Sequence, residues 1–169
     1  MASGVSNWDH LISEMLRCTA PGGYVELCEG EIKLNCDDGT MAEDNPLKVF
    51  VDTLKESMVK SGRIPPDMPF LKRLLEKAGF EDITTFKANE PVGPWPKDPR
   101  LKKIGAMQML HSETLFESYE MAAFTRALDM DVKKAQELCD AGRAANLNKN
   151  YHTYSTYNRV YGRKSSGRN

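Results

Sequence analysis

Two ionisable side chains of this sequence are candidates for acid–base chemistry, Glu29 and His111. Glu29 directly follows Tyr24–Cys28, a mostly apolar run that predicts a buried strand. Open α/β sheets bind ligands at the carboxyl ends of their strands, so Glu29 is a candidate general base or substrate contact. His111 lies between apolar helical stretches, where an imidazole can serve as acid, base or hydrogen-bond donor. A surface carboxylate and a helix-boundary histidine are the simpler alternatives for these two candidate catalytic residues.

The segment around His111 is rich in methionine and aromatic residues, and it predicts an apolar binding surface. Met107, Met109, Phe116 and Tyr119 follow one another in a helical stretch. Such a stripe more often packs in a core, but methionine also suits an adaptable apolar pocket. Trp95, which stands between two prolines, is the candidate wall of that pocket. These five residues are the predicted substrate-binding set.

Three further carboxylates, Glu31, Asp37 and Asp38, lie in a polar loop without a histidine nearby in sequence. A solvated turn is therefore favoured over a metal site, and we predict no bound metal. The four cysteines show no C-x-x-C spacing, which favours reduced, structural thiols. We find no nucleophile motif and no phosphate loop. Any activity must then come from a shaped apolar cavity and a few hydrogen-bond donors.

Composition limits the classes of partner. The chain has 169 residues, a formal net charge of −1 and an isoelectric point near 6.3. Nucleic acid is not an expected partner, because such binders usually present a basic face. No apolar run is long enough to span a membrane, and the first residues lack the features of a secretory signal. We therefore expect a cytoplasmic protein that does not bind membranes.

Helix start and stop signals place the first elements. A helix is expected from about Asn7 to Cys18, with Ser6 and Asp9 at the spacing of a capping box. A Pro-Gly-Gly turn ends it, and the strand Tyr24–Cys28 follows. Asn45, followed by a proline, predicts the start of the next helix.

The middle of the chain predicts a helix near Met68–Ala78 that ends at Gly79, then a strand near Ile83–Lys87 with room to extend to Val92. The next ten residues, PVGPWPKDPR, contain four prolines and predict a stiff loop.

The last part of the chain predicts three helices and a closing strand. The helices are Leu101–Leu110, Glu113–Leu128 and Asp131–Ala145, with Ser112 and Asp131 as N-caps. The run YHTYSTYNRVYGR, residues 151–163, is rich in Tyr, Thr and Val and predicts a long final strand.

These motifs, in this order, resemble the C-terminal half of the fungal LaeA-like class I S-adenosylmethionine (SAM) methyltransferases. The run PVGPWPKDP is the most specific part, whereas a helix, P-G-G and a strand are common. The resemblance implies a Rossmann-like α/β fold that lacks the SAM-binding half. We expect a small three-stranded mixed sheet with helices and a helical substrate lid. A single domain 1–169 would comprise a core remnant (1–92), a proline-rich loop and insert (93–148), the closing strand (149–163) and a tail.

The resemblance also implies how the sheet is ordered and what could bind to it. The final strand should lie in the middle and Tyr24–Cys28 at an edge, where it reads as apolar on both faces. Unpaired N–H and C=O groups on such an edge invite another strand, so we expect a homodimer, or a partner that covers this strand.

The resemblance leaves three functions open. A chain without the glycine-rich turn, and so without bound cofactor, could be a cyclase of the Diels–Alder type. It would act on an apolar secondary metabolite by holding one reactive conformer. The second hypothesis is a methyltransferase completed by another chain or belonging to a longer gene. The third is a regulatory protein without catalysis that binds other proteins. Of the three, we favour the cyclase, because the Met-rich stretch and the absence of a nucleophile motif fit it.

Overall fold

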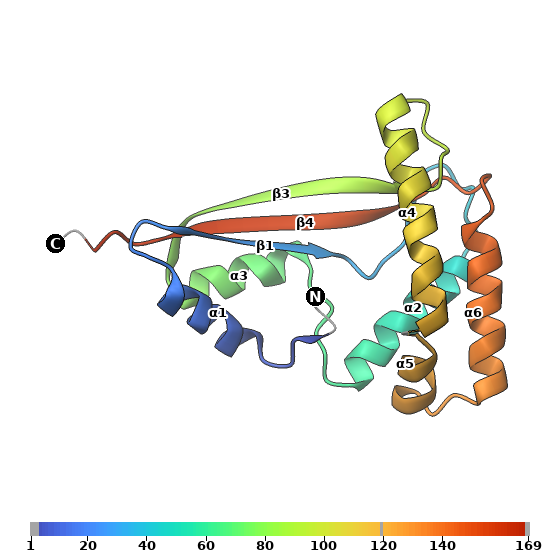
Figure 1. Ribbon diagram of the computed structural model, residues 1–169, viewed down its shortest axis with the longest axis horizontal. Coiled ribbons are helices and arrows are strands. Elements are labelled where there is room, and N and C mark those ends of the chain that lie inside the picture. Colours follow the sequence, from blue (N-terminus) through green and yellow to red (C-terminus); the bar gives the residue numbers. More distant parts are fainter. Residues whose placement is uncertain (1–3, 119, 168–169) are drawn as a thin grey trace. The chain divides into compact units, whose positions relative to one another are not determined.

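The computed structural model describes residues 4–118 and 120–167. The described chain is an α/β protein with six helices and four strands (Figure 1). In chain order these are α1 Trp8–Cys18, β1 Tyr24–Gly30, β2 Asn35–Cys36, α2 Pro46–Lys60, α3 Met68–Ala78, β3 Phe80–Val92, α4 Pro99–Ser118, α5 Glu120–Ala127, α6 Val132–Asn146 and β4 Thr153–Lys164.

The sheet has the predicted central strand. β4 pairs with β1 from Tyr24 opposite Arg163 to Gly30 opposite Tyr157, and it also pairs with β3 and with the short β2. In Figure 1, β4 lies between β1 and β3. The sheet differs from the expectation in two respects: it has four strands rather than three, and its pairing is antiparallel rather than mixed. Both β1 and β3 run opposite to the strand between them, so no parallel pair forms.

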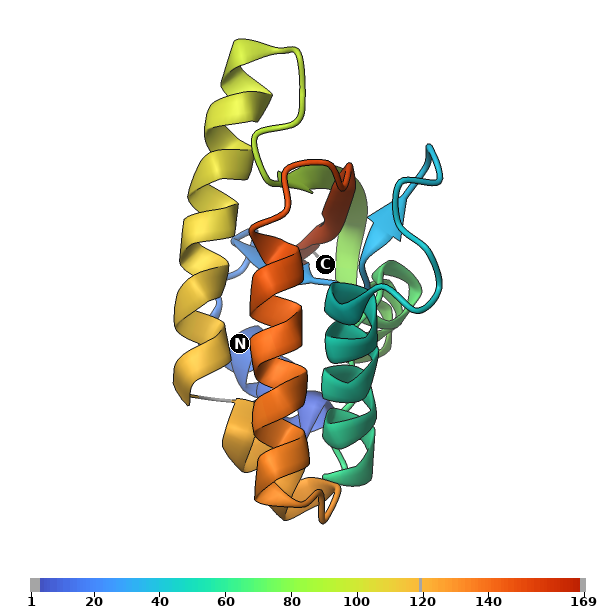
Figure 2. The ribbon, with the colours of Figure 1, turned by 90° about the vertical axis from the view of Figure 1, so that its right-hand side faces the viewer.

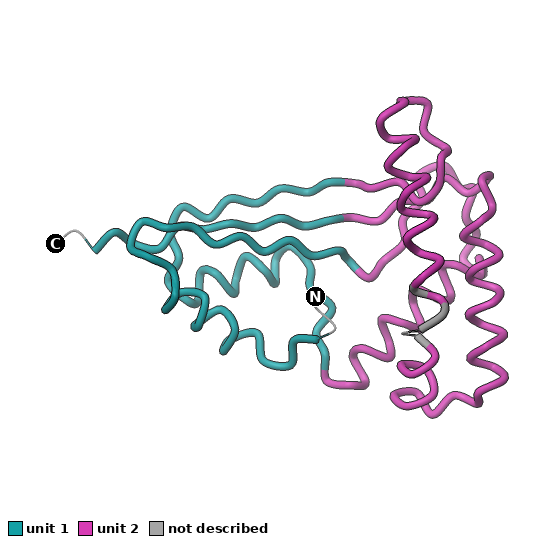
Figure 3. Tube along the Cα trace, viewed as in Figure 1, with its two compact units in different colours: residues 1–31, 63–88, 157–169 teal, residues 32–62, 89–156 magenta. Residues whose placement is uncertain are grey.

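The chain divides into two compact units, which are interleaved in sequence (Figure 3). Unit 1 comprises residues 1–31, 63–88 and 157–169, and unit 2 comprises residues 32–62 and 89–156. The expected division into core remnant, insert and closing strand stays a prediction.

In unit 1, α1 and α3 pack against each other and cover one face of the sheet (Figure 1). Burial along β1 alternates: Val25 and Leu27 are buried, whereas Tyr24 and Cys28 are exposed. The expectation of a strand buried on both faces was therefore wrong. Glu29 does not follow this strand but lies within it, on the buried face.

Local capping explains where the unit 1 helices begin and end. Asn7, not the predicted Ser6, caps α1, and its Oδ1 accepts from the backbone N–H of His10 at 3.0 Å. Asp67 caps α3 in the same way by accepting from the N–H of Phe70. Gly79 ends α3 as predicted, because its φ of 95° lies in the left-handed region that glycine tolerates.

In unit 2, the helices α2, α4, α5 and α6 enclose an apolar core. Figure 2 shows α4 (yellow), α6 (orange) and α2 (teal) next to one another. The ring of Phe50 lies 4.6 Å from that of Phe116 and 5.6 Å from that of Phe124. Cys139 of α6 is buried in the same cluster. The aromatic packing of these three rings fixes the helices of this unit.

Three N-caps were predicted for the helices of unit 2, namely Asn45, Ser112 and Asp131, and two of them are confirmed. Asn45 accepts from the N–H groups of Leu47 and Lys48, and Asp131 caps α6. Ser112 does not cap a helix, because α4 continues through it to Ser118. Its hydroxyl donates instead to the carbonyl of Gln108 at 2.8 Å, a bond that a serine inside a helix readily makes.

No helix among residues 4–118 and 120–167 combines the length and the apolar character needed to cross a bilayer.

Candidate functional site

Unit 2 contains a cavity of about 310 Å³ beside the proline-rich loop that follows β3. Its apolar wall comes from Pro91 at the end of β3, from Trp95 and Pro96 of the loop, and from Leu101. Its polar lining residues are Asp37, Asn89, Lys97, Asp98 and Tyr154. A volume of this size suits a small organic molecule, and an apolar lining with a few placed polar groups is typical of such sites.

Trp95 is held in place from two sides. Its indole Nε1 donates to the carbonyl oxygen of Thr153 at 2.9 Å. The indole ring stacks on the imidazole of His152, with the ring centres 5.1 Å apart and an angle of 28° between the planes. Thr153 begins β4 and His152 directly precedes it, so the start of this strand positions the wall of the cavity.

A polar cluster behind Trp95 fixes His152 in turn. Asp38 Oδ2 is hydrogen-bonded to Nδ1 of His152. The other oxygen of Asp38 accepts from the hydroxyl of Thr40 at 2.8 Å and from the thiol of Cys36 at 3.3 Å. The same Thr40 hydroxyl accepts from the backbone N–H of His152 at 2.9 Å. The imidazole, followed by the bonds from Thr40, holds the pKa of the Asp38 carboxyl well below its usual range.

Two polar side chains, Tyr154 and Asn89, line the cavity itself. The phenol of Tyr154 donates to Oδ1 of Asp37 at 2.9 Å, and this bond, together with burial, raises the pKa of Tyr154. Asn89 Oδ1 accepts from the hydroxyl of Thr156 at 3.3 Å. No bond to Nδ2 of Asn89 is found in the described chain, so this amide nitrogen is a donor that a ligand in the cavity can use.

This arrangement can bind and orient an apolar molecule with one acceptor group. The imidazole of His152, which stacks on Trp95, is engaged with Asp38. Within residues 4–118 and 120–167, no three His, Cys, Asp or Glu side chains are placed to hold a metal ion. The polar side chains that line the cavity can bind a ligand, orient it and form hydrogen bonds with it.

The structure does not bring the predicted site residues together. Trp95 lines the cavity, but Met107 is 70% exposed and His111 is exposed on α4. Met109 is half-buried, and Phe116, only 4% exposed, packs in the helical core against Phe50.

The two remaining predicted site residues, Glu29 and Tyr119, are not placed relative to this cavity. Glu29 is buried in β1 of unit 1, and Tyr119 lies outside the described residues. The roles that the sequence analysis gave to the whole set, Trp95 included, stay predictions.

Most of the residues around the cavity carry no local signal in the sequence. Asp37 and Asp38 were read as a solvated turn because no histidine is close in sequence, yet His152 arrives from 114 positions further along the chain. The alternation of Tyr and Thr in the last strand was the one available signal for Tyr154.

The fold is that of an α/β protein and is consistent with a methyltransferase-like fold, and comparison with known proteins specifies the relationship. No protein-family model matches the sequence. "Methyltransferase pytC" of Aspergillus terreus is 33% identical over 128 residues, which are 76% of this chain and 40% of the relative.

Two further relatives extend this match along the chain. "Probable methyltransferase tdiE" of Emericella nidulans is 29% identical over 91% of the chain and 49% of its own length. "Secondary metabolism regulator LAE1" of Cochliobolus heterostrophus is 28% identical over 92% of the chain and 52% of its own length. The chain thus spans about half the length, or less, of these relatives. It is homologous to fungal methyltransferases and LaeA-like regulators, which confirms the resemblance.

Proposed function

We propose that this chain is the substrate-binding part of a methyltransferase-like protein of fungal secondary metabolism. It holds an apolar small molecule in the unit 2 cavity. The observation that supports this proposal is the cavity itself, with Trp95 fixed as a wall and the amide of Asn89 as a free donor. The printed names of the relatives, methyltransferases and secondary metabolism regulators, support the class of chemistry.

The connections between the described strands and helices support the proposal that this chain alone does not bind SAM. Class I methyltransferases hold it on a glycine-rich turn between a strand and a helix. Here β1 leads to β2 rather than to a helix. The loop between β2 and α2 has the single glycine Gly39, and the proline-rich loop between β3 and α4 has the single glycine Gly93. Methyl transfer by this chain would therefore need groups from other residues, either of a longer protein or of a second chain.

A cofactor-independent cyclisation is the second candidate, and the composition of the cavity favours it. The proline-flanked Trp95 and Leu101 form a rigid apolar wall that can select one folded conformer of a flexible substrate. Asn89 Nδ2 can donate to a carbonyl of that substrate and polarise it, which assists a Diels–Alder-type ring closure.

Binding in the cavity can be tested with a neutral aromatic ketone, 2-acetonaphthone, and ¹⁵N-labelled protein. The chain has two tryptophans, so two indole N–H signals are expected, which the Trp8→Phe and Trp95→Phe variants assign. The ketone should shift the Trp95 signal. Asn89→Leu should weaken binding by about two- to tenfold, the worth of one hydrogen bond. Asn150→Leu, an exposed asparagine of the same unit, is the control. An unshifted Trp95 signal at millimolar ketone would refute the proposal.

Calorimetric titration with SAM separates the two reactions. If SAM gives no heat of binding, with or without the ketone, methyl transfer by this chain on its own is excluded and cyclisation remains as the candidate reaction. Stoichiometric binding would show that a SAM site exists after all and would overturn the argument from the described residues.

We also propose that β1 pairs with a second copy of this chain. In the described chain β1 pairs only with β4, which leaves its other edge without a strand. Light scattering should then give twice the chain mass of 19.0 kDa. A monomer at 100 µM would refute the homodimer, and co-purification of a different chain would favour a heteromeric complex instead.

A further inference from the structure

The first half of α4 displays two large apolar side chains to solvent. Met107 is 70% exposed and Leu110 is 65% exposed. Figure 2 shows the first turns of this helix (yellow-green) extending past the ends of α2 and α6, which belong to the same unit. The packed side of α4 faces the other way, because Gly105 lies against the carbonyl of Gly93 and Phe116 is buried in the core. Met107 and Leu110 are therefore free to contact another molecule.

These two residues continue a stripe that begins near the start of the helix. Arg100, Lys103, Met107 and Leu110 follow one another at intervals of three, four and three residues, and all four are exposed. We call this stripe the α4 seam, and it extends over about 15 Å of the helix axis. Its spacing is that of the a and d positions of a coiled coil, which keep to one side of a helix. Such a narrow seam matches a second helix, whereas a helix that lies on a membrane needs a wider apolar face.

The cations at the start of the α4 seam determine the charge of the expected partner. Residues 97–103 contain four lysine or arginine side chains and one carboxylate, that of Asp98. Asp98 Oδ1 is already engaged, because it accepts from the backbone N–H of Leu101 at 2.8 Å. In the described part of the chain, Arg100 and Lys103 form neither an ion pair nor a hydrogen bond. Both charges are therefore available to carboxylates of a partner.

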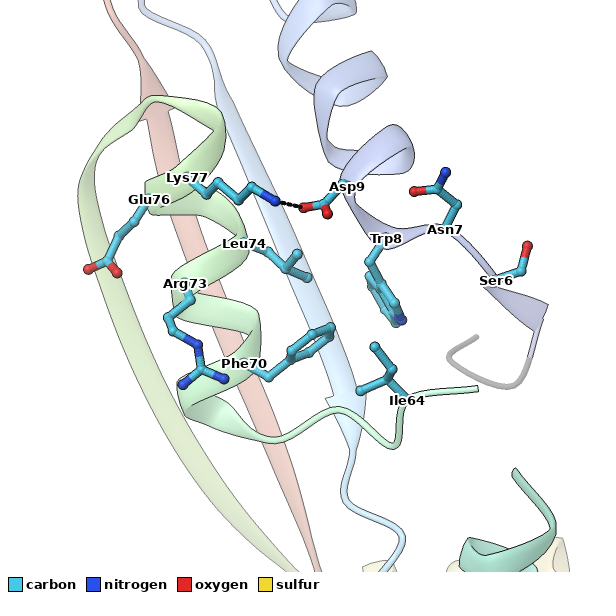
Figure 4. A pocket seen from close by; sticks show the side chains of 10 residues that line it. All are labelled: Ser6, Asn7, Trp8, Asp9, Ile64, Phe70, Arg73, Leu74, Glu76 and Lys77. Carbon is cyan, nitrogen blue, oxygen red and sulfur yellow. Dashed lines mark ion pairs between the residues drawn. The ribbon is translucent and has the colours of Figure 1, made fainter. Parts of the chain in front are cut away.

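The apolar side chains of unit 1 are arranged differently. Trp8, Ile64, Phe70 and Leu74 line a hollow of about 650 Å³ beside α1 and α3 (Figure 4). The rings of Trp8 and Phe70 meet edge to face with their centres 5.8 Å apart, so they pack on each other. Ile64, by contrast, is 49% exposed. This hollow is the apolar surface that competes with the α4 seam, and Ile64 offers a matched control for it.

We propose that the α4 seam binds an acidic amphipathic helix of a partner protein. Apolar side chains of the partner pack against Met107 and Leu110, and its carboxylates, one to two turns away, pair with Arg100 and Lys103. None of these four residues lines the cavity of unit 2, so the proposal does not rest on the proposed function.

The probes are two fluorescein-labelled synthetic helices, each constrained by a hydrocarbon staple on the side away from its own seam. Both carry two glutamates and two leucines at the spacing of the α4 seam. The glutamates precede the leucines in one peptide, for parallel binding, and follow them in the other, for antiparallel binding. Fluorescence anisotropy with the whole 169-residue protein measures the affinity. One peptide should bind with a dissociation constant of roughly 100 µM or tighter, and added salt should weaken this binding because the charge pairs are exposed.

Substitutions at exposed positions separate the apolar from the charged contribution. Leu110→Gln should weaken binding by about tenfold, because an apolar contact is lost and the helix propensity changes little. Lys103→Glu should weaken it by about fivefold. A peptide with lysines in place of the glutamates should bind the double variant Arg100→Glu/Lys103→Glu better than the wild type. Val132→Gln, at a 65% exposed position of α6, and Ile64→Gln are the controls and should bind like the wild type.

NMR of the methionine methyl groups locates the contact. The signal of Met107, assigned with Met107→Gln, should shift when the peptide is added. Failure of both peptides to bind at millimolar concentration would overturn the proposal, and so would a loss of binding in Ile64→Gln but not in Leu110→Gln. If phosphatidylserine vesicles bound through Leu110 while the peptides did not, the occupant would be a membrane surface. If the Met107 signal shifted only on concentrating the protein alone, it would be a second copy of this chain. Either result would refute the acidic helix.

Discussion

Replacing Gly105 by alanine should destabilise the protein, although alanine is the better helix former. A Cβ atom at Gly105 would overlap the carbonyl oxygen of Gly93 and lie 2.8 Å from its carbonyl carbon. Carbon atoms in contact normally stay about 3.5 Å apart, so α4 and the loop must separate by at least about 0.7 Å, and the overlap with the oxygen demands more than that. The bond from the N–H of Gly93 to the carbonyl of Gly105, 3.0 Å long, would then be lost.

The expected size of this effect follows from three contributions. Overpacking against a rigid backbone costs about 1–3 kcal/mol, and the lost hydrogen bond costs about 1 kcal/mol. The better helix propensity of alanine returns about 1 kcal/mol. We therefore expect the free energy of unfolding of Gly105→Ala to fall by about 1–3 kcal/mol.

Urea unfolding followed by circular dichroism measures this change. Lys103→Ala, at an exposed position of the same helix, is the control and should stay within about 0.5 kcal/mol of the wild type. Gly105→Ala should also shift the indole signal of Trp95, because the displaced loop carries that residue. If Gly105→Ala were as stable as the wild type or more so, α4 and the loop would not approach each other as closely as the structure shows.

Three other substitutions test the arrangement of unit 2. His152 lowers the pKa of Asp38, so this carboxylate stabilises the fold above the pKa it has when unfolded, about 4, and the effect is lost as the pH falls. Asp38→Asn should therefore lower the urea midpoint at pH 7, and its difference from the wild type should shrink between about pH 5 and 2; a constant difference would contradict the pairing. Phe116 packs in the core, so Phe116→Ala should lower the free energy of unfolding, measured in urea, by about 3–5 kcal/mol. If this variant were instead as stable as the wild type but bound 2-acetonaphthone less well, Phe116 would be a substrate contact, as the sequence predicted. Trp95→Phe loses the bond to Thr153 and should cost about 1 kcal/mol; unchanged stability would argue against that bond.

Local signals in the sequence predicted much of the secondary structure. Capping bonds reach only across one helical turn, so the residues that make them can be recognised locally. The structure confirms the predicted N-caps Asn45 and Asp131 and the helix end at Gly79. The capping residue of α1 was misplaced by one position, because Ser6 and Asn7 are both good N-caps. The helix boundary at Ser112 failed for a related reason: a serine hydroxyl can cap a helix or bond back to a carbonyl within it.

Contacts that are distant in sequence could not be predicted in this way. The central position of β4 came from the resemblance to a known fold, not from the residues themselves. Asp38 and His152 lie on segments that only this topology brings together, and neither has a local signal. The Met-rich stretch was read as a binding surface, yet helical periodicity alone does not say which face of α4 is covered, and Met107 proves to be exposed.

The position of β4 as the partner of β1 also has a consequence for synthesis on the ribosome. Cys28 pairs with Arg159, which is made 131 residues later. At about 5–20 residues per second, β1 waits on the order of ten seconds for the strand that completes its hydrogen bonding. During that interval neither unit can close, because both contain residues of β4. The nascent chain is therefore expected to depend on chaperones that shield Val25 and Leu27 until the last strand emerges.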